Sequence, residues 1–191
     1  MDDIVKAALA KWPNVPDCYG WLGLDARGNW YMRDDQAQSA GLFCAPSNDP
    51  GRQMASKGSM LKHDKLIDFI QRNHASDAKG QWFFQNGPQR VYVELEATPY
   101  IWRVYGVPDF DVTAHDGQVA ITQRCIIDEH GRVYLETALG FGLVHTQDML
   151  QVADAIESGL WVPQEVLAKD LQGRFGYVRS PQGLNGALLK K

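Results

Sequence analysis

The stretch from Asp77 to Tyr105 constrains the fold of this chain more than any other. Its sequence, DAKGQWFFQNGPQRVYVELEATPYIWRVY, predicts three consecutive strands, at residues 81–85, 90–96 and 100–105. Asn-Gly at 86–87, between apolar runs, is a strong hairpin signal because both residue types tolerate positive φ. We therefore expect a β-meander, with the rest of the chain packed onto it.

Alternation in the second strand divides its side chains between two faces. Val91, Val93 and Leu95 share one face, and the other face carries Arg90, Tyr92, Glu94 and Glu96. A period of two is typical of a sheet with one buried side and one side that faces water or a partner. The second set is therefore expected on the open side of the sheet.

Composition and charge narrow the class of protein. The 191 residues are 45% hydrophobic and 22% charged, with a formal net charge of −4, as in ordinary globular proteins. This charge argues against nucleic-acid binding, which normally needs a basic face, and does not favour an anionic membrane. No apolar run reaches the roughly 20 residues that cross a bilayer, and the acidic start, Met1-Asp2-Asp3, does not resemble a signal peptide. We expect a cytoplasmic protein.

The cysteines and histidines form no metal-binding or disulfide pattern. Cys18, Cys44 and Cys125 are widely separated, whereas disulfide frameworks and zinc sites need close pairs. His63 and His145 each precede a predicted helix, and neither lies in a His-x-x-x-His arrangement. Phosphate-binding glycine loops and Gly-x-Ser-x-Gly elbows are also missing. The sequence predicts no metal and no cofactor.

Helices are predicted where apolar residues recur at helical spacing between capping signals. The four segments are residues 2–11, 61–73, 147–158 and 163–173.

Three other segments lack helical periodicity. Residues 36–58 are rich in Ser, Gly, Ala and Pro, which predicts a flexible insertion, with a functional flap as the alternative. Residues 175–179 are interpreted as a last edge strand and residues 181–191 as a loose tail.

One turn pattern occurs three times at nearly equal spacing, as Asp-Ala-Arg-Gly at 25–28, Asp-Ala-Lys-Gly at 77–80 and Asp-Glu-His-Gly at 128–131. Each copy predicts a type I turn followed by a left-handed glycine and a strand. The spacing suggests an internal duplication in which turn, strand and helix are used twice. The alternative is that such hairpins are simply common in α+β proteins.

These elements predict an α+β protein of two related subdomains, each an antiparallel sheet with a helix packed on one face. The N-terminal subdomain would span residues 1–97 and include the 36–58 insertion, and the C-terminal subdomain would span residues 98–191.

The same turns and strands resemble a family of uncharacterised bacterial cytoplasmic proteins known only as a domain of unknown function. The matching positions within residues 20–160 are Gly28, Trp30, Tyr31, Leu66, Phe69, Asp77, Gly80, Trp82, Arg90, Val91, Val93 and residues 131–135. The resemblance implies a duplicated α+β unit, a pleckstrin-homology-like second half and a role in signalling. This chain departs from the pattern in its 36–58 insertion and its histidines.

A ligand site is expected on the outward side of the meander. Arg90 and Arg103 could bind an anion beside Glu94, and Tyr100 and Trp102 could line a pocket. The alternatives are ion pairs on a solvated face for the charged residues and ordinary core for the aromatic ones. The site would lie in a groove between the halves, next to the insertion, and bind a small molecule or a protein. The oligomeric state is left open.

The rival hypothesis is an enzyme that uses Glu94 or Glu96 as general base and His63 or His145 as acid. It requires one of these carboxylates in a closed pocket within hydrogen-bonding reach of a histidine. No motif in the sequence names a reaction, so we expect no catalytic residues and a non-catalytic binding module.

Overall fold

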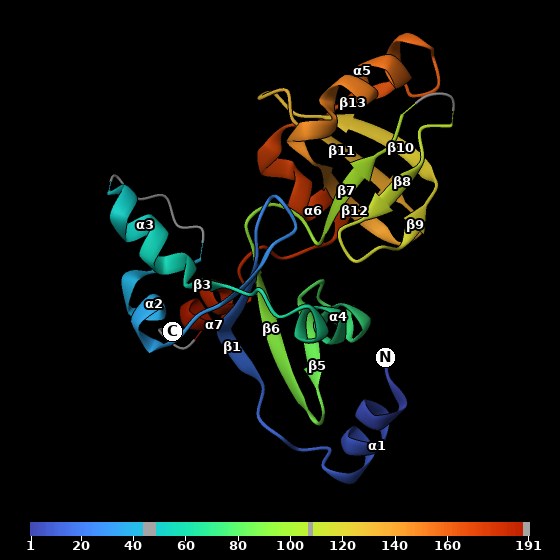
Figure 1. Cartoon of the computed structure of the whole chain (residues 1–191). Coiled ribbons are helices and arrows are strands. Elements are labelled where there is room, and N and C mark those ends of the chain that lie inside the picture. Colours follow the sequence, from blue (N-terminus) through green and yellow to red (C-terminus); the bar gives the residue numbers. More distant parts are fainter. Residues whose placement is uncertain (44–48, 107–108, 189–191) are drawn as a thin grey trace. The chain divides into compact units, whose positions relative to one another are not determined.

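The computed structural model describes residues 1–43, 49–106 and 109–188. The chain divides into two compact units (Figure 1). Unit 1 comprises Met1–Asp25, Asn29–Glu96 and Tyr177–Lys191, and unit 2 comprises Ala26–Gly28 and Ala97–Gly176. Each unit has its own sheet with helices, so the protein is α+β.

Unit 1 is built on a six-stranded sheet with the order β3-β2-β1-β6-β5-β4. Its strands are β1 (Cys18–Leu24), β2 (Trp30–Met32), β3 (Ser59–Met60), β4 (His74–Ser76), β5 (Trp82–Asn86) and β6 (Gln89–Leu95). Neighbouring strands are antiparallel except β1 and β6, which are parallel. Its helices are α1 (Asp3–Lys11), α2 (Asp35–Ala40), α3 (Pro50–Lys57), α4 (Asp64–Arg72) and α7 (Pro181–Leu188).

Unit 2 is built on a seven-stranded sheet with the order β13-β10-β11-β12-β7-β8-β9. Its strands are β7 (Tyr100–Val104), β8 (Val112–Ala114), β9 (Val119–Ala120), β10 (Thr122–Ile127), β11 (Val133–Thr137), β12 (Gly140–Val144) and β13 (Pro163–Glu165). β7 runs parallel to β12, and β13 runs parallel to β10. Its helical segments are η1 (Thr146–Asp148), α5 (Met149–Glu157), η2 (Ala168–Asp170) and α6 (Leu171–Phe175).

The two sheets share one strand order, in which β1 to β6 correspond to β7 to β12 and the parallel pair β1–β6 corresponds to β7–β12. In unit 2, a single residue, Ile121, separates β9 from β10 along the chain. In unit 1, helix α4 stands between β3 and β4, the corresponding strands. At this connection the units therefore differ by one helix, α4.

The first hairpin and the two main helices are confirmed, but the three-strand meander is wrong. β7 pairs with β8 and β12 in the second sheet rather than with β6, because the chain passes from unit 1 to unit 2 after Glu96. β5, β6 and β7 lie at the predicted strands, and Gly87 in the first turn has φ 57°. α4 and α5 lie within the predicted helices, but they occupy different connections: α4 links β3 to β4, whereas α5 follows β12. The predicted equivalence of these two helices is therefore wrong, because it matched turn copies that do not correspond in strand order.

The three Asp–Gly turns have the same local geometry. In each, the first aspartate accepts a hydrogen bond through Oδ1 from the backbone N–H four residues later, at 2.8–2.9 Å. The other carboxylate oxygen accepts from a tyrosine hydroxyl. The aspartates are Asp25, Asp77 and Asp128, and their tyrosines are Tyr31, Tyr92 and Tyr134. Each turn glycine has positive φ, between 74° and 85°, which is the left-handed conformation that the sequence predicted.

The described part of residues 36–58 contains two helices, so the prediction of an irregular segment is wrong there. Asp34 precedes α2 as its N-cap and accepts from the backbone N–H of Ala37. Asp49 caps α3 in the same way by accepting from the backbone N–H of Gly51. These caps satisfy the first N–H groups of two short helices despite a composition typical of loops. Residues 44–48 lie outside the described residues.

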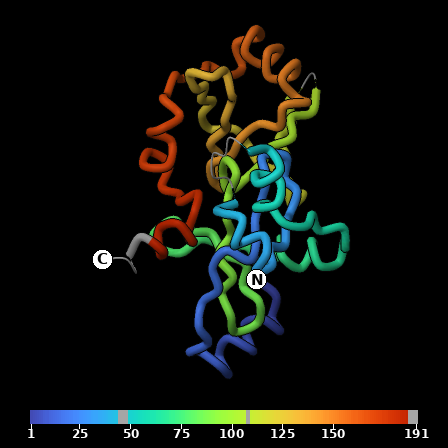
Figure 2. Tube along the Cα trace, turned by 90° about the vertical axis from the view of Figure 1, so that its left-hand side faces the viewer, coloured from blue at the N-terminus to red at the C-terminus, as the bar shows by residue number. Residues whose placement is uncertain are grey.

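The C-terminal region also differs from its prediction. Residues 163–165 form strand β13 rather than the start of a helix, and only Val178 forms a bridge, to Gln81, where an edge strand was expected. Residues 181–188 form α7 instead of a loose tail, and this helix packs against β1 and β6 of unit 1 (Figures 1 and 2). Long-range packing, which periodicity does not encode, stabilises this short helix.

The return of the C-terminal segment changes the environment of β6. Alternation is confirmed, because Val91 and Val93 face away from Tyr92 and Glu94. The expectation that the second set faces water is wrong, since Tyr92 is 3% and Glu94 only 1% exposed. Both sides of the strand are covered: α4 lies over one side of the sheet and α7 over the other.

Candidate functional site

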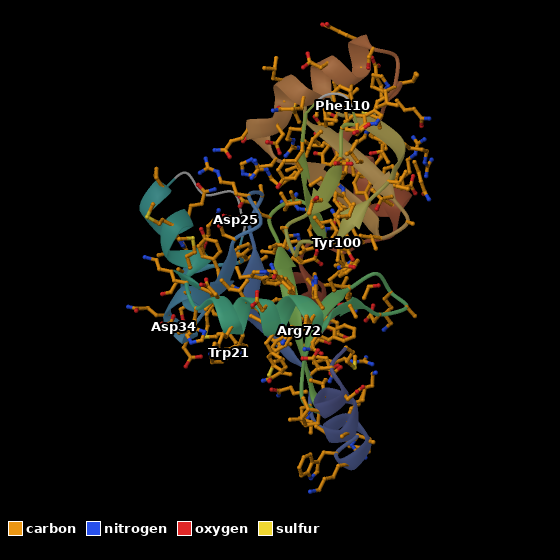
Figure 3. The ribbon with its side chains drawn as sticks, turned by 45° about the vertical axis from the view of Figure 1, so that its right-hand side comes forward. Trp21, Asp25, Asp34, Arg72, Tyr100 and Phe110 are labelled. Atoms are coloured by element: carbon orange, nitrogen blue, oxygen red, sulfur yellow. The ribbon has the colours of Figure 1, made fainter. Side chains whose placement is uncertain are left out.

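Unit 1 contains an apolar pocket of about 400 Å³ between α4 and the sheet. Residues from β1, β2, β5, β6 and α4 line it: Cys18, Trp21, Leu22, Met32, Leu66, Phe69, Ile70, Phe84, Asn86, Gln89 and Val91. Pockets of roughly 300–1,000 Å³ that are mostly apolar are typical small-molecule sites. This pocket is the candidate site, and Trp21 on its wall is labelled in Figure 3.

Strand pairing places the pocket residues on one face of the sheet. Leu22 pairs with Met32 in β2, and Val91 pairs with both Cys18 and Phe84. Residues that pair directly across neighbouring strands point to the same side. The sheet therefore forms one continuous apolar wall of the pocket.

Helix α4 provides the opposite wall. Its apolar stripe contains Leu66, Phe69 and Ile70, and the ring of Phe69 meets the ring of Phe84 edge to face, with centroids 5.4 Å apart. Ile70 is buried, whereas Leu66 and Phe69 are partly accessible. The insertion of this helix between β3 and β4 therefore creates the pocket.

The pocket lining is uncharged. Its polar side chains are Asn86 and Gln89, at the turn between β5 and β6, and the thiol of Cys18 on β1. Gln89 donates from Nε2 to the carbonyl oxygen of Pro16 at 3.1 Å, which fixes the orientation of its carboxamide. Because an unpaired charge is costly in apolar surroundings, this lining favours an uncharged ligand with one hydrogen-bonding end.

Two lining residues are large apolar side chains that remain accessible. Trp21 is 43% and Met32 is 48% exposed. Gly20, with φ 81°, lies in an irregularity of the β1–β6 pairing between Cys18 and Leu22. This bulge brings Trp21 to the pocket wall together with its neighbour Leu22.

The two histidines of the enzyme hypothesis start helical segments. His63 accepts at Nδ1 from the backbone N–H of Leu66, and His145 accepts at Nδ1 from that of Gln147, both at 3.2 Å. A side-chain acceptor at this position satisfies an N–H group that has no partner within the helix. The interpretation of both histidines as helix-start residues is confirmed.

The two carboxylates proposed as general bases, Glu94 and Glu96, each bind neighbouring polar side chains or backbone groups. Glu94 accepts from the Ser180 hydroxyl at 2.6 Å and from the backbone N–H of Gln182 at 2.8 Å. Burial raises the pKa of Glu94, and these two hydrogen bonds oppose that rise. Glu96 forms an ion pair with Lys57 at 2.8 Å. The acid–base role of both residues stays a prediction.

The predicted ligand residues of unit 1 lie on the face of β6 opposite the pocket. Arg90 places its guanidinium over the ring of Phe83, 4.7 Å from the centroid, and Glu94 contacts the start of α7. Neither lines the apolar pocket, because Val91 and Gln89 occupy the pocket side of the strand.

The predicted ligand residues of unit 2 lie in its core and in an ion pair. The rings of Tyr100 and Trp102 stack with centroids 5.1 Å apart, and both residues are buried. Burial raises the pKa of Tyr100 to about 12. Arg103 binds Asp148 through two hydrogen bonds, of 2.6 and 2.9 Å. The expectation that these aromatic rings face outward is wrong, and their role in ligand binding stays a prediction.

Sequence reasoning missed most of the pocket residues. Leu66 and Phe69 were matched only to the family pattern, and Cys18 was noted only as one of three separated cysteines. Trp21 and Met32 were not singled out. One signal was present: Trp21 and Met32 are large apolar residues in strands next to a helix with a wide apolar stripe. The pairing of β1 with β6, which joins distant segments, was not predictable from local pattern.

Other kinds of site have less support among residues 1–43, 49–106 and 109–188. No cluster of three His, Cys, Asp or Glu side chains there has the arrangement of a metal site. None of the helices in this part of the chain has the length and apolar character needed to span a bilayer.

The chain belongs to the family DUF2944, described as "Protein of unknown function (DUF2946)", whose model matches residues 1–182. A search of curated proteins gave no match.

Two solved structures share similarity with this chain at low identity. One is a DUF1285 family protein from Silicibacter pomeroyi DSS-3, with 12% identity and a TM-score of 0.48, covering 81% of this chain and 84% of the other. The second is a DUF1285 family protein from Shewanella baltica OS155, with 13% identity and a TM-score of 0.42, covering 70% and 91%.

Proposed function

We propose that this protein is a non-catalytic binding module and that the apolar pocket of unit 1 holds a small, uncharged, largely apolar ligand. The observation that carries the proposal is a cavity of about 400 Å³ whose lining has nine apolar or thiol side chains and two carboxamides, with no charged group. Such a lining favours apolar burial, with Asn86 and Gln89 orienting one polar end of the ligand.

The strand order shared by the two sheets supports a second part of the proposal, that the units arose by duplication. In this view one copy gained helix α4 between its third and fourth strands, and with it a pocket, whereas one residue separates the corresponding strands of the other copy. A role in signalling and a pleckstrin-homology-like second half, which the sequence resemblance implies, stay predictions.

Shielding of Cys18 by an uncharged apolar probe tests the proposed function. N-phenyl-1-naphthylamine is expected to slow alkylation of Cys18 by iodoacetamide at least tenfold at saturation, because Cys18 lines the pocket. The experiment uses the full chain with Cys44→Ser. Cys125 is buried, which raises the pKa of its thiol to about 11 and makes it a slow competitor. Peptide mass spectrometry assigns the label.

Two outcomes are informative. Slower labelling of Cys18, with unchanged slow labelling of Cys125, supports binding in the pocket. Probe fluorescence that rises on binding while Cys18 reacts at its original rate would place the probe elsewhere and remove the proposal.

A further inference from the structure

The last described segment of the chain, residues 177–188, is called the C-terminal strap below. It follows unit 2 in sequence but packs on unit 1. Its first residues pair with unit 1 through the backbone: the N–H of Val178 donates to Gly80 at 2.9 Å, and the N–H of Leu95 donates to Arg179 at 2.8 Å. The strap is thereby attached beside β6.

Polar groups fix the start of the strap helix α7. Ser180 and the backbone N–H of Gln182 both donate to the carboxylate of Glu94, and the Ser180 hydroxyl accepts from the N–H of Gly183. A carboxylate is favourable at a helix N-terminus, where N–H groups lack helical partners. Glu94 therefore anchors α7 to β6.

Among residues 181–186 of α7, Pro181 is buried, but the one large apolar side chain, Leu184, is largely accessible. Leu184 is 44% exposed, and Gly183 and Gly186 lie within eight residues of sequence PQGLNGAL. Each glycine lowers the stability of a helix relative to alanine. Polar contacts with unit 1 are therefore a substantial part of what docks the strap.

One of these contacts reaches the strand that forms the pocket wall. Gln182 accepts from Nη1 of Arg33 at 3.1 Å, and the same nitrogen donates to the carbonyl oxygen of Gly20 at 2.8 Å. The Gln182 side chain also fills the space where a side chain of Gly20 would begin. Gly20, the bulge residue of β1, is thus held between the strap and Arg33.

The groups held by the strap are direct neighbours of pocket residues. Gly20 precedes Trp21, and Arg33 follows Met32. The backbone N–H of Arg33 also donates to the carbonyl oxygen of Trp21 at 2.9 Å. The strap contacts one face of β1 and the pocket lies on the other face. Both therefore depend on the same backbone conformation around Gly20 and Arg33.

We propose that the C-terminal strap regulates the apolar pocket: the docked strap holds the β1 bulge in the conformation that binds ligand, and release of the strap weakens binding. This inference rests on the proposed function, because it concerns the same pocket. Coupling between two sites is reciprocal, so ligand in the pocket also stabilises the docked strap.

The full chain with Ser180→Ala and Gln182→Ala tests the coupling. Loss of the Ser180 hydroxyl bond to Glu94 and of the Gln182 side-chain bond to Arg33 is expected to speed amide hydrogen exchange in residues 182–188. The Kd for N-phenyl-1-naphthylamine is expected to rise about fivefold or more, the lower end of measured couplings between sites. Saturating probe is expected to slow exchange of the same amides in the wild type.

Asn185→Ala is the matched control, because Asn185 lies in α7 but donates only within the strap, to Pro181. Faster exchange with an unchanged Kd in the double variant would overturn the regulatory role and leave the pocket intact. Unchanged exchange in the double variant would show that these contacts do not hold the strap, which also overturns it. If the probe does not shield Cys18 in the wild-type protein, the pocket is not the binding site. That result would reject both the proposed function and this inference.

Discussion

Replacing Trp102 with alanine is expected to lower the free energy of unfolding by about 3–5 kcal/mol, the usual cost of removing a large buried aromatic side chain. Trp102 is fully buried, stacks on Tyr100, and donates from Nε1 to the carbonyl oxygen of Leu135 at 3.0 Å. Its loss leaves a cavity and a buried carbonyl group without this donor. Urea unfolding followed by circular dichroism measures the change.

Trp21→Ala is the control for this variant, because Trp21 is 43% exposed and lines the pocket. It is expected to cost less than about 1 kcal/mol of stability while weakening probe binding. If Trp102→Ala does not fold, Trp102→Phe serves in its place, because it keeps most of the apolar volume. It should lower the free energy of unfolding by less than the roughly 3–5 kcal/mol expected for Trp102→Ala and by more than Trp21→Ala does. A cost below about 1 kcal/mol for Trp102→Ala would contradict the core role and favour the ligand-binding role predicted from sequence.

Asp128→Ala is expected to destabilise the protein by about 2–4 kcal/mol, since its carboxylate is buried and holds the turn between β10 and β11. It accepts from the backbone N–H groups of His130 and Arg132 and from the Tyr134 hydroxyl. Removal leaves buried donors without these partners, at about 1–3 kcal/mol for each unsatisfied group. Asp116→Ala, in the exposed turn before β9, is the matched control and should cost little.

The effect of Asp128 depends on pH. Burial opposes its ionisation, but hydrogen bonds from Arg132, Tyr134 and His130 outweigh burial and lower the pKa of this carboxyl group. Its stabilisation is therefore present above the ordinary aspartate pKa of about 3.9. It is lost as the pH falls through the lowered folded-state value. Unfolding curves should show the difference between wild type and Asp128→Ala shrinking in acid, and a constant difference would contradict this account.

The sequence correctly predicted the turns, strands and helices that residues close together in the chain define. The Asn-Gly turn and the alternation around Val91 predicted the hairpin of β5 and β6, and the spacing of Leu66 and Ile70 predicted α4. The Asp–Gly turns were predictable because an aspartate, a left-handed glycine and a strand define them within a few residues.

What the sequence did not predict depends on contacts between distant segments. Glu94 was expected on an open face because alternation cannot reveal that residues 180–182 return to cover it. The parallel strand pairs were not predicted for the same reason, because the pairing of β1 with β6 joins segments separated by most of unit 1. The pocket was missed for both reasons: it needs that pairing, and it needs α4 at the gap between β3 and β4.

The most direct test of the pocket compares two methionines of similar exposure on neighbouring strands. Met32 is 48% exposed and lines the pocket, whereas Met60 is 43% exposed and lies outside the lining. Fluorescence titration with N-phenyl-1-naphthylamine is expected to give a Kd about fivefold or more higher for Met32→Ala, because the ligand loses apolar contact. Met60→Ala should leave the Kd unchanged. Equal Kd values for both variants and the wild type would contradict ligand binding between α4 and the sheet.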